Sequence, residues 1–392
     1  MTRQILLSIL VRFLIYFVHW MVLAHLPVLL KHGGFGDVAI GLAIGVLSLS
    51  SMLLMLPMGV FSDIFSPKRT LLAGAGCFAV YFLLLPQVAS LPGLLVATVT
   101  GGLGAAALVV VSESLYLKQF GQERRGRRVA IYHCSTYLGF GLGPLFGSLL
   151  LEQGPGWLFA AAGIGALLIL AVGMLLQDHE VMVFSFREYG DGLREFKPLL
   201  LMACIFVMGT HFGVEQTSIS LLMSETLGVT AQGIGVYFAL VGIWMAAVVP
   251  YVGRLHDKRS SVFLFFLAGL ALSGIFQALT AWATGFWSLV AIRLLHTLGD
   301  AIALLELSVL MAILFPSKRL GGSSGLLYAI RTMATFGAAV LSGAVNRHWS
   351  YGASFLTNGL FVLCFVLLSF TLIATSRERR LEVGWLKAKA DG

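Results

Sequence analysis

The stretch QDHEVMVFSFREYGDGLREFK, residues 177–197, is the longest polar segment in a chain of 392 residues. Six apolar runs precede this segment and six follow it. Most of the runs hold the ~20 residues that a helix needs to cross the hydrocarbon core of a bilayer. The sequence therefore predicts an all-α polytopic membrane protein with twelve transmembrane helices, divided into two sets of six. The expected spans are 5–30, 38–60, 70–89, 93–117, 129–151, 156–176, 198–223, 232–252, 261–281, 285–315, 324–346 and 351–375.

Composition supports a membrane protein and excludes several other classes. Hydrophobic residues make up 58% of the chain and charged residues 11%, whereas soluble domains average roughly 45–50% apolar and about 25% charged residues. These values exclude a soluble enzyme and a disordered chain. The four cysteines are scattered through apolar runs without a CxxC pair, so the sequence predicts neither a disulfide framework nor a zinc site.

The distribution of Lys and Arg predicts the orientation of the chain. When the amino terminus is placed in the cytoplasm, 21 of the 26 Lys and Arg residues fall in cytoplasmic segments, and Lys31 and Arg347 fall on the other side. This bias follows the positive-inside rule of membrane proteins. We therefore expect both termini in the cytoplasm. We interpret the basic loops as determinants of topology rather than as a surface for nucleic acid.

Two features recur at nearly the same interval along the chain. The second span ends in GVFSD (residues 59–63) and the eighth ends in GRLHD (residues 253–257), 194 residues later. His19 and His211 are 192 residues apart, each in the middle of a span. A repeated interval with matching topology predicts a duplicated six-helix unit. The expected domains are an amino-terminal bundle (1–176), a cytoplasmic linker (177–197), a carboxy-terminal bundle (198–375) and a basic cytoplasmic tail (376–392).

These features together resemble the major facilitator superfamily of secondary transporters, over nearly the whole chain. The first signature of that superfamily is a glycine and an aspartate four residues apart, followed by basic residues. It is matched after the second span, although Ile64 stands where a basic residue is usual. The resemblance implies that this motif acts as a gate between the two bundles at the cytoplasmic surface. The expected gate residues are Gly59, Asp63, Lys68, Arg69, Gly253, Asp257, Lys258 and Arg259.

The fifth span contains GFGLGPLFGS, residues 139–148. Gly139, Gly143 and Gly147 fall on one face of a helix, where small residues allow another helix to pack closely. Pro144 bends the helix at this point. The segment resembles a motif of proton-coupled exporters in the superfamily, with Ser148 in place of the usual final glycine. This resemblance implies efflux by exchange of a solute for protons.

Seven formally charged residues lie inside the expected spans. Each costs about 2.5–3.5 kcal/mol at the centre of a bilayer unless it is paired or hydrated. Six of the seven lie on spans one, four, seven and ten, which line the central cavity in the resembled superfamily. The proton-coupling candidates are Glu113, Glu215, Asp300 and Glu306, and the substrate-cavity candidates are Arg12, His19, His211, Arg293, His296 and Arg331.

Helical spacing predicts which of these side chains share a face. His211, Glu215 and Ser218 fall on one face of span seven. Arg293, His296 and Asp300 fall on one face of span ten. We interpret Arg293 and Asp300 as a pair in which each charge compensates the other. Neither Glu113 nor Glu215 has a basic residue within a helical turn, which makes these two acids the leading candidates for the proton carrier.

The leading hypothesis is a secondary active transporter in the bacterial inner membrane that exports a small organic solute by alternating access. We expect a monomer that is driven by protons and needs no other cofactor. One alternative is an uptake porter for an organic anion that uses Arg12, Arg293 and Arg331, and another is a transporter of a lipid-type substrate. A non-transporting receptor or assembly factor with the same fold is an alternative from a different class. No phosphate loop, metal constellation or nucleophile motif appears in the sequence, so we do not expect an enzyme.

Overall fold

The computed structural model describes residues 3–64, 66–117, 125–178, 196–256, 262–314 and 320–375. Every element within these residues is helical. The described residues contain 12 segments that are long and apolar enough to cross a membrane. The protein is therefore an all-α polytopic membrane protein, as the apolar runs predict.

The elements of each half follow one another in chain order. The first half contains α1 (Arg3–Leu23), α2 (Leu26–His32), α3 (Asp37–Ile64), α4 (Pro67–Leu84), η1 (Leu85–Gln87), α5 (Leu91–Leu117), α6 (Arg125–Leu151) and α7 (Pro155–Met174). The second half contains α8 (Phe196–Leu221), η3 (Leu222–Thr226), α9 (Ala231–His256), α10 (Val262–Leu279), η4 (Thr280–Trp282), α11 (Phe286–Leu314), α12 (Leu320–His348) and α13 (Tyr351–Thr375).

The first span is interrupted, although the sequence predicts one continuous helix over residues 5–30. α1 ends at Leu23 and α2 begins at Leu26, with Pro27 in the first turn of α2. Proline has no backbone N–H, so Pro27 cannot continue the hydrogen-bond ladder of α1. Beyond this break, α2 reaches the second half of the chain, where the Nε2 atom of His32 lies 3.6 Å from the Oε1 atom of Glu225.

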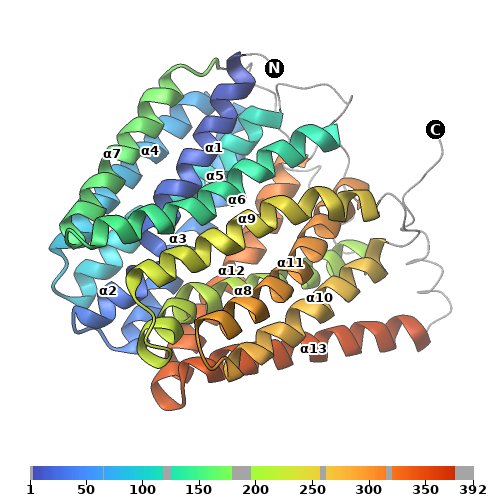
Figure 1. The fold of residues 1–392 in the computed structure, drawn as a ribbon. Coiled ribbons are helices and arrows are strands. Elements are labelled where there is room, and N and C mark those ends of the chain that lie inside the picture. Colours follow the sequence, from blue (N-terminus) through green and yellow to red (C-terminus); the bar gives the residue numbers. More distant parts are fainter. Residues whose placement is uncertain are drawn as a thin grey trace.

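The helices form two bundles that lie side by side. Helices α1–α7 pack together on one side and α8–α13 on the other (Figure 1). The bundles meet mainly along two helix pairs, α3 with α12 and α6 with α9. The start of α1 and the end of α13 lie toward the same end of the molecule, which we name the terminal end, and the other end is the distal end (Figure 1).

The two bundles are in close contact in the middle of the molecule and at its distal end. On the α3–α12 pair, a Cβ atom added to Gly41 would lie 2.6 Å from the carbonyl oxygen of Ala339. On the α6–α9 pair, a Cβ atom added to Gly242 would lie 2.5 Å from the Cα atom of Gly141. Only glycine permits backbones to approach so closely, so these residues allow the bundles to seal against each other.

An aromatic cluster also joins the two bundles. The ring centroids of Trp20 and Phe140 are 4.5 Å apart, and those of Phe140 and Phe238 are 5.5 Å apart. The three rings come from α1, α6 and α9, so the cluster crosses the interface between the bundles. Aromatic pairs at these distances stabilise an interface beyond the area that they bury. The cluster therefore reinforces the contact between the halves.

The glycines of the span-five segment pack against α1, as their spacing predicts. A Cβ atom added to Gly139 would lie 2.6 Å from the carbonyl oxygen of Phe13, and one added to Gly147 would lie 2.5 Å from that of Met21. A Cβ atom added to Gly143 would overlap the carbonyl oxygen of Phe17. The glycine stripe thus fixes α1 and α6 side by side, which positions the polar residues of both helices.

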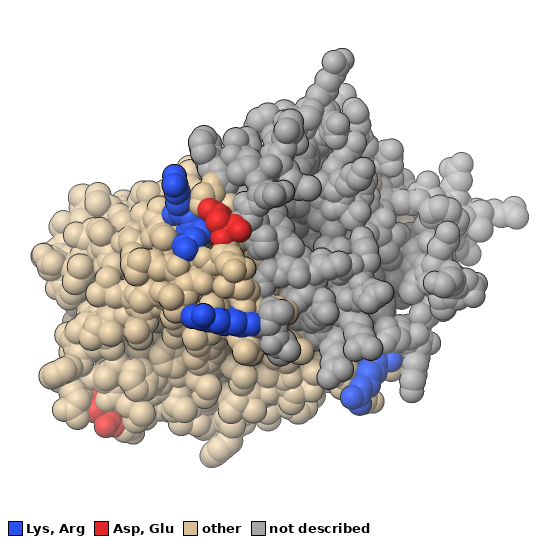
Figure 2. Space-filling model, turned by 90° about the horizontal axis from the view of Figure 1, so that it is seen from above, with Lys and Arg blue, Asp and Glu red and all other residues tan. Residues whose placement is uncertain are grey.

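The surface that the structure describes carries few charges. Figure 2 shows one face of the molecule, on which Lys, Arg, Asp and Glu occupy only small patches among uncharged side chains. Large apolar side chains are exposed on the outer helices, among them Leu167 on α7 and Leu367 on α13. A surface of this kind is stable in contact with lipid hydrocarbon rather than with water.

Replacing Gly143 by alanine should destabilise the fold. The added methyl group would collide with the backbone of α1, and overpacking of this kind costs about 1–3 kcal/mol. We expect a lower Tm in thermal unfolding of the purified protein in detergent. The matched control is Gly163→Ala on α7, where an added Cβ meets no atom within 4 Å. That control should leave the Tm unchanged or raise it, and equal losses of Tm in both variants would contradict the packing role.

Candidate transport site

A cluster of charged side chains lies between α8 and α11 in the second half. Glu215 on α8 forms an ion pair with the Nη2 atom of Arg293 on α11. The Nε2 atom of His296 lies 2.8 Å from the Oε1 atom of Glu215 and 3.0 Å from the Oδ2 atom of Asp300. Arg293, His296 and Asp300 are all buried, so the cluster excludes most water. We name these four residues the α8–α11 cluster.

The surroundings of His296 determine how many protons its ring carries. Its Nδ1 atom lies 2.9 Å from the carbonyl oxygen of Ser273, which can only accept a hydrogen bond. Its Nε2 atom faces the carboxylates of Glu215 and Asp300. Since both ring nitrogens face acceptors, both should carry a proton, and the ring is then an imidazolium. This assignment also leaves the α8–α11 cluster with two positive and two negative charges.

Ser273 on α10 connects the cluster to a second histidine. Its hydroxyl group donates a 2.6 Å hydrogen bond to the Oδ1 atom of Asp300. The Nε2 atom of His211 lies 3.2 Å from the same hydroxyl oxygen. Because the hydroxyl proton is used on Asp300, Nε2 of His211 must donate, and its buried Nδ1 atom has no hydrogen-bond partner among the described residues. His211 is thus a neutral ring that adjoins the charged cluster.

Uncharged polar side chains hold Arg293 in place. Its Nε atom donates to the hydroxyl of Tyr237 on α9 at 3.1 Å, and its Nη1 atom donates to the Oε1 atom of Gln277 on α10 at 2.6 Å. Gln277 donates in turn to Asn358 on α13 at 3.1 Å. A buried guanidinium that is surrounded in this way is fixed in geometry. The arrangement therefore orients Arg293 toward Glu215.

These contacts correct one prediction about side-chain pairing. Arg293 and Asp300 were expected to compensate each other within span ten, but Arg293 pairs with Glu215 and Asp300 pairs with His296. Spacing along one helix cannot reveal a partner that comes from another helix, which explains the error. Ser218 lies on α8 with His211 and Glu215, and its hydroxyl contacts that of Ser342 on α12, at 2.6 Å.

A second network lies in the first half, around Arg12 on α1. The guanidinium donates to the Thr136 hydroxyl at 3.0 Å and to the carbonyl oxygen of Val109 at 3.1 Å. Its Nη2 atom lies 3.7 Å from the Oε2 atom of Glu113 on α5. It also lies over the ring of Tyr132, 4.7 Å from the ring centroid. Arg12 is therefore fully engaged by protein groups.

Glu113 links this network to the second half. The hydroxyl of Tyr328 on α12 donates to the Oε2 atom of Glu113 at 2.9 Å. The guanidinium of Arg331, one turn further along α12, lies over the ring of Tyr328 at 4.6 Å and near that of Phe212 on α8 at 5.5 Å. A carboxylate of the first bundle is thus bonded directly to the second bundle, beside an arginine.

The other predicted residues lie elsewhere or outside the described side chains. The ring of His19 stacks on that of Phe78, with centroids 5.6 Å apart, inside the first bundle. Glu306 is buried on α11, six residues beyond Asp300.

The predicted gate residues are only partly described. The Nζ atom of Lys68 donates to the carbonyl oxygen of Met174 at 2.6 Å, which is a contact within the first half. Asp257, Lys258 and Arg259 lie outside the described residues. Gly59 and Asp63 lie in α3, and the structure does not describe the surroundings of Gly59 or the side chain of Asp63. Gly253 lies in the last turns of α9.

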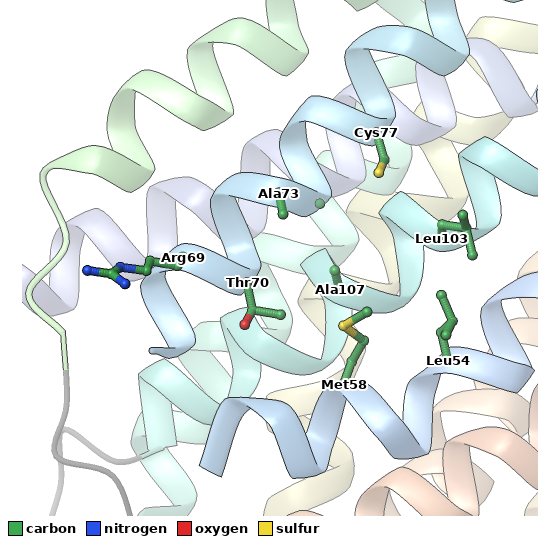
Figure 3. A pocket seen from close by; sticks show the side chains of 9 residues that line it. Leu54, Met58, Arg69, Thr70, Ala73, Cys77, Leu103 and Ala107 are labelled. Atoms are coloured by element: carbon green, nitrogen blue, oxygen red, sulfur yellow. The ribbon is translucent and has the colours of Figure 1, made fainter. Parts of the chain in front are cut away.

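A pocket of about 430 Å³ lies between α3, α4 and α5. Its walls are mainly apolar, with Leu54, Met58 and Leu103 among the lining residues. Arg69, which is also one of the predicted gate residues, lies at the rim of the pocket. Its side chain points away from the other labelled side chains (Figure 3). The pocket is thus separate from the two networks, because it shares none of their charged residues.

Three residues of the second half could offer ligand atoms to a metal. Ligand atoms of His211, His296 and Asp300 lie within 4.8 Å of one another. However, both nitrogens of His296 already face hydrogen-bond acceptors, and the nearby Arg293 would repel a divalent cation. We therefore interpret the group as a hydrogen-bonded ion cluster, and the absence of a metal site stays a prediction.

Sequence reasoning missed the uncharged residues that complete both networks. In a span with high mean hydropathy, a glutamine such as Gln277 is costly, so its presence was a signal that could have been used. The tyrosines and hydroxyl residues gave no such signal, because they are common in packed membrane helices. The missed residues are Tyr16, Thr136, Tyr132, Tyr237, Ser273, Gln277 and Asn358.

Comparison with known proteins identifies the family. The sequence matches the Major Facilitator Superfamily over residues 8–208 and 199–388. The chain belongs to the Major Facilitator Superfamily. It is 23% identical over 353 residues to an uncharacterized MFS-type transporter, MJ1560, of Methanocaldococcus jannaschii, covering 87% of this chain and 90% of that protein. It is 24% identical over 366 residues to the inner membrane transport protein YajR of Escherichia coli, covering 88% of this chain and 79% of that protein.

Solved structures share the fold of this superfamily member. A POT family transporter in complex with a thioalcohol-conjugated peptide superposes with a TM-score of 0.80 at 13% sequence identity, covering 95% of this chain and 97% of that one. The human organic anion transporter MFSD10 superposes with a TM-score of 0.70 at 19% sequence identity, covering 93% of this chain and 98% of that chain. These TM-scores show a common fold, and membership of the superfamily supports a membrane transporter.

Removing Arg293 alone should destabilise the protein more than removing both members of its ion pair. Arg293→Gln leaves Glu215 with an unbalanced charge in a buried site, and breaking a buried pair costs about 3–5 kcal/mol. The double variant Glu215→Gln/Arg293→Gln should recover part of the lost Tm. The control is Arg347→Gln at the exposed end of α12, which should change the Tm little. A double variant that is less stable than Arg293→Gln would contradict the pairing.

Proposed function

We propose that the protein is a proton-coupled secondary transporter that moves a small organic solute by alternating access. Family membership supports transport, and the α8–α11 cluster supports the coupling ion. The expected orientation, with both termini in the cytoplasm, places the terminal end inside the cell and the distal end outside. We take residues 1–176 and 198–375 as the two moving bundles, in a bacterial inner membrane.

The position of His296 carries this proposal. An imidazolium between Glu215 and Asp300 balances the charge of the cluster, as the distances of 2.8 and 3.0 Å allow. Loss of one proton would leave two carboxylates, one arginine and a neutral ring, which is an excess negative charge in a medium of low dielectric constant. Histidine gains and loses a proton within the physiological pH range. A single proton can therefore change the attraction between α8 and α11.

This mechanism gives a role to the acids predicted as proton carriers. Glu215 and Asp300 act as the acceptors that hold the proton on His296, rather than as carriers on their own. Glu113 lies in the other network, where Tyr328 bonds it across the bundle interface. Protonation of Glu113 would weaken its attraction to Arg12, so it remains a second candidate for a coupling residue.

The span-five segment favours export over uptake as the direction of transport. Its likeness to a motif of proton-coupled exporters is independent of the α8–α11 cluster. With the distal end closed by α3, α12, α6 and α9, a solute would enter from the terminal end and leave after those contacts part. In this view, protons that move inward through the cluster drive the solute outward. Uptake of an organic anion is the second candidate, because Arg331 is available for such a ligand.

Proton movement by the wild type should depend on His296. Proteoliposomes that contain a pH-sensitive dye are exposed to a panel of small organic acids, amines and neutral solutes. We expect at least one solute to change the pH of the lumen. His296→Gln should abolish this pH change, since glutamine keeps hydrogen-bonding groups but cannot titrate. The variant should still exchange labelled solute across the membrane at equal pH, where no net proton movement is needed.

The control for this measurement is His348→Gln, at the exposed end of α12. This variant should move protons and solute as the wild type does. Equal proton movement in His296→Gln and the wild type would show that the proton is carried elsewhere. Solute flux by the wild type without any change of lumen pH would refute proton coupling.

The direction of transport can be measured separately. In inverted membrane vesicles that are energised to an acidic lumen, an exporter should accumulate its solute in the lumen in exchange for protons. An uptake porter coupled to protons should deplete the lumen of solute under the same gradient. Accumulation that collapses on addition of a protonophore is the expected outcome, and depletion would reverse the proposed direction.

A further inference from the structure

Arg331 differs from the other two arginines inside the described spans. Arg12 and Arg293 are each 2% exposed and each lies within 4 Å of a glutamate carboxylate. Arg331 is only partly buried as a residue, and within the described residues its guanidinium makes no ion pair or hydrogen bond. Its neighbours are two aromatic rings, Tyr328 at 4.6 Å and Phe212 at 5.5 Å.

An arginine without an anionic partner is costly inside a membrane span. Charged side chains in such spans are rare unless they are paired or hydrated, and they commonly mark substrate or ion pathways. Cation–π contacts with Phe212 and Tyr328 recover only part of this cost, because an aromatic face attracts a cation more weakly than a carboxylate does. The guanidinium keeps all of its N–H donors available, so an anion that entered from the central interface would complete the site.

The position of Arg331 between the two networks strengthens this interpretation. Tyr328, which lies under the guanidinium, bonds to Glu113 of the first bundle. Phe212, the second ring near the guanidinium, directly follows His211 in the chain. The ring of His211 contacts Ser273, which donates to Asp300 of the α8–α11 cluster. A ligand on Arg331 would therefore touch elements that carry both networks. It would also lie beside the interface that must open and close during alternating access.

We propose that Arg331, flanked by Phe212 and Tyr328, binds the carboxylate group of a monoanionic organic solute. A guanidinium matches a carboxylate through two parallel N–H donors. A monoanion neutralises the single unpaired charge, whereas a dianionic phosphate would leave an excess negative charge in a site of low dielectric constant. The two aromatic rings favour a planar or apolar body attached to the carboxylate. The proposal names the substrate class of the transporter proposed above and rests on that function.

The experiment measures binding rather than transport, so its result does not depend on proton coupling. The purified protein is titrated with benzoate, phenylacetate, 3-phenylpropionate and hexanoate, with benzamide and benzylamine as neutral and cationic counterparts of benzoate. The readout is the Tm in detergent at constant pH and ionic strength. At least one carboxylate should raise the Tm of the wild type in a saturable way, and the two counterparts should not.

Three variants assign the effect to the guanidinium. Arg331→Gln removes the charge and should weaken carboxylate binding by about 10-fold or more, because hydrogen bonds to charged groups contribute at that level. Arg331→Lys keeps the charge but loses the paired donors, so it should bind with intermediate affinity. Arg347→Gln removes an exposed arginine from the same helix and should bind as the wild type does.

Several outcomes would overturn the proposal. The proposal is wrong if no carboxylate of the panel raises the Tm of the wild type, or if benzamide raises this Tm as much as benzoate does. It is also wrong if Arg331→Gln binds the carboxylate as tightly as the wild type does. If Arg331→Gln does not fold, the comparison of Arg331→Lys with Arg347→Gln decides, since only the first should weaken binding. Carboxylate binding in a protein that moves no protons would leave this proposal standing and refute proton coupling alone.

Discussion

A charge inside a bilayer needs a partner of opposite sign or water, and this requirement governs the interior of the protein. The 12 apolar spans in the part of the chain that the structure describes form a medium of low dielectric constant, in which each unpaired charge is costly. The arginines at positions 12 and 293 meet this requirement through carboxylates on other helices. Charge pairing therefore decides which helices face each other, and the glycine stripes then allow those helices to come close.

The two networks differ in what they connect. The α8–α11 cluster lies within the second bundle and is extended by residues of α9, α10 and α13. The network around Arg12 joins three helices of the first bundle and reaches α12 through Tyr328. A change of protonation in the α8–α11 cluster would alter contacts within the second bundle. A change of protonation at Glu113 would alter its hydrogen bond to Tyr328, which joins the two bundles. In the proposed mechanism of alternating access, the first kind of change would act within one bundle and the second would act on the contact between the bundles.

The position of His296 shows why the same residue type can serve different chemistry. Its ring is held between two carboxylates and a carbonyl oxygen, so the protein environment favours the charged form. His211 is only 5.5 Å away between ring centroids, yet it contacts a hydroxyl group and keeps one nitrogen without a partner in the described structure. His19 packs on an aromatic ring. Three intramembrane histidines thus have three environments, which only their neighbours define.

The sequence by itself determined the twelve spans, the division into two halves and the helices that carry the charges. Hydropathy and glycine spacing are local properties, and in a membrane protein they are enough to fix where helices run and which faces can pack closely. The pairing of charges was decided only by the tertiary structure. Arg293 has Asp300 on its own helical face but bonds to Glu215, because α8 approaches α11 at that depth. Distance in space, rather than spacing along a helix, sets electrostatic energy, and that distance is known only once the helices are packed.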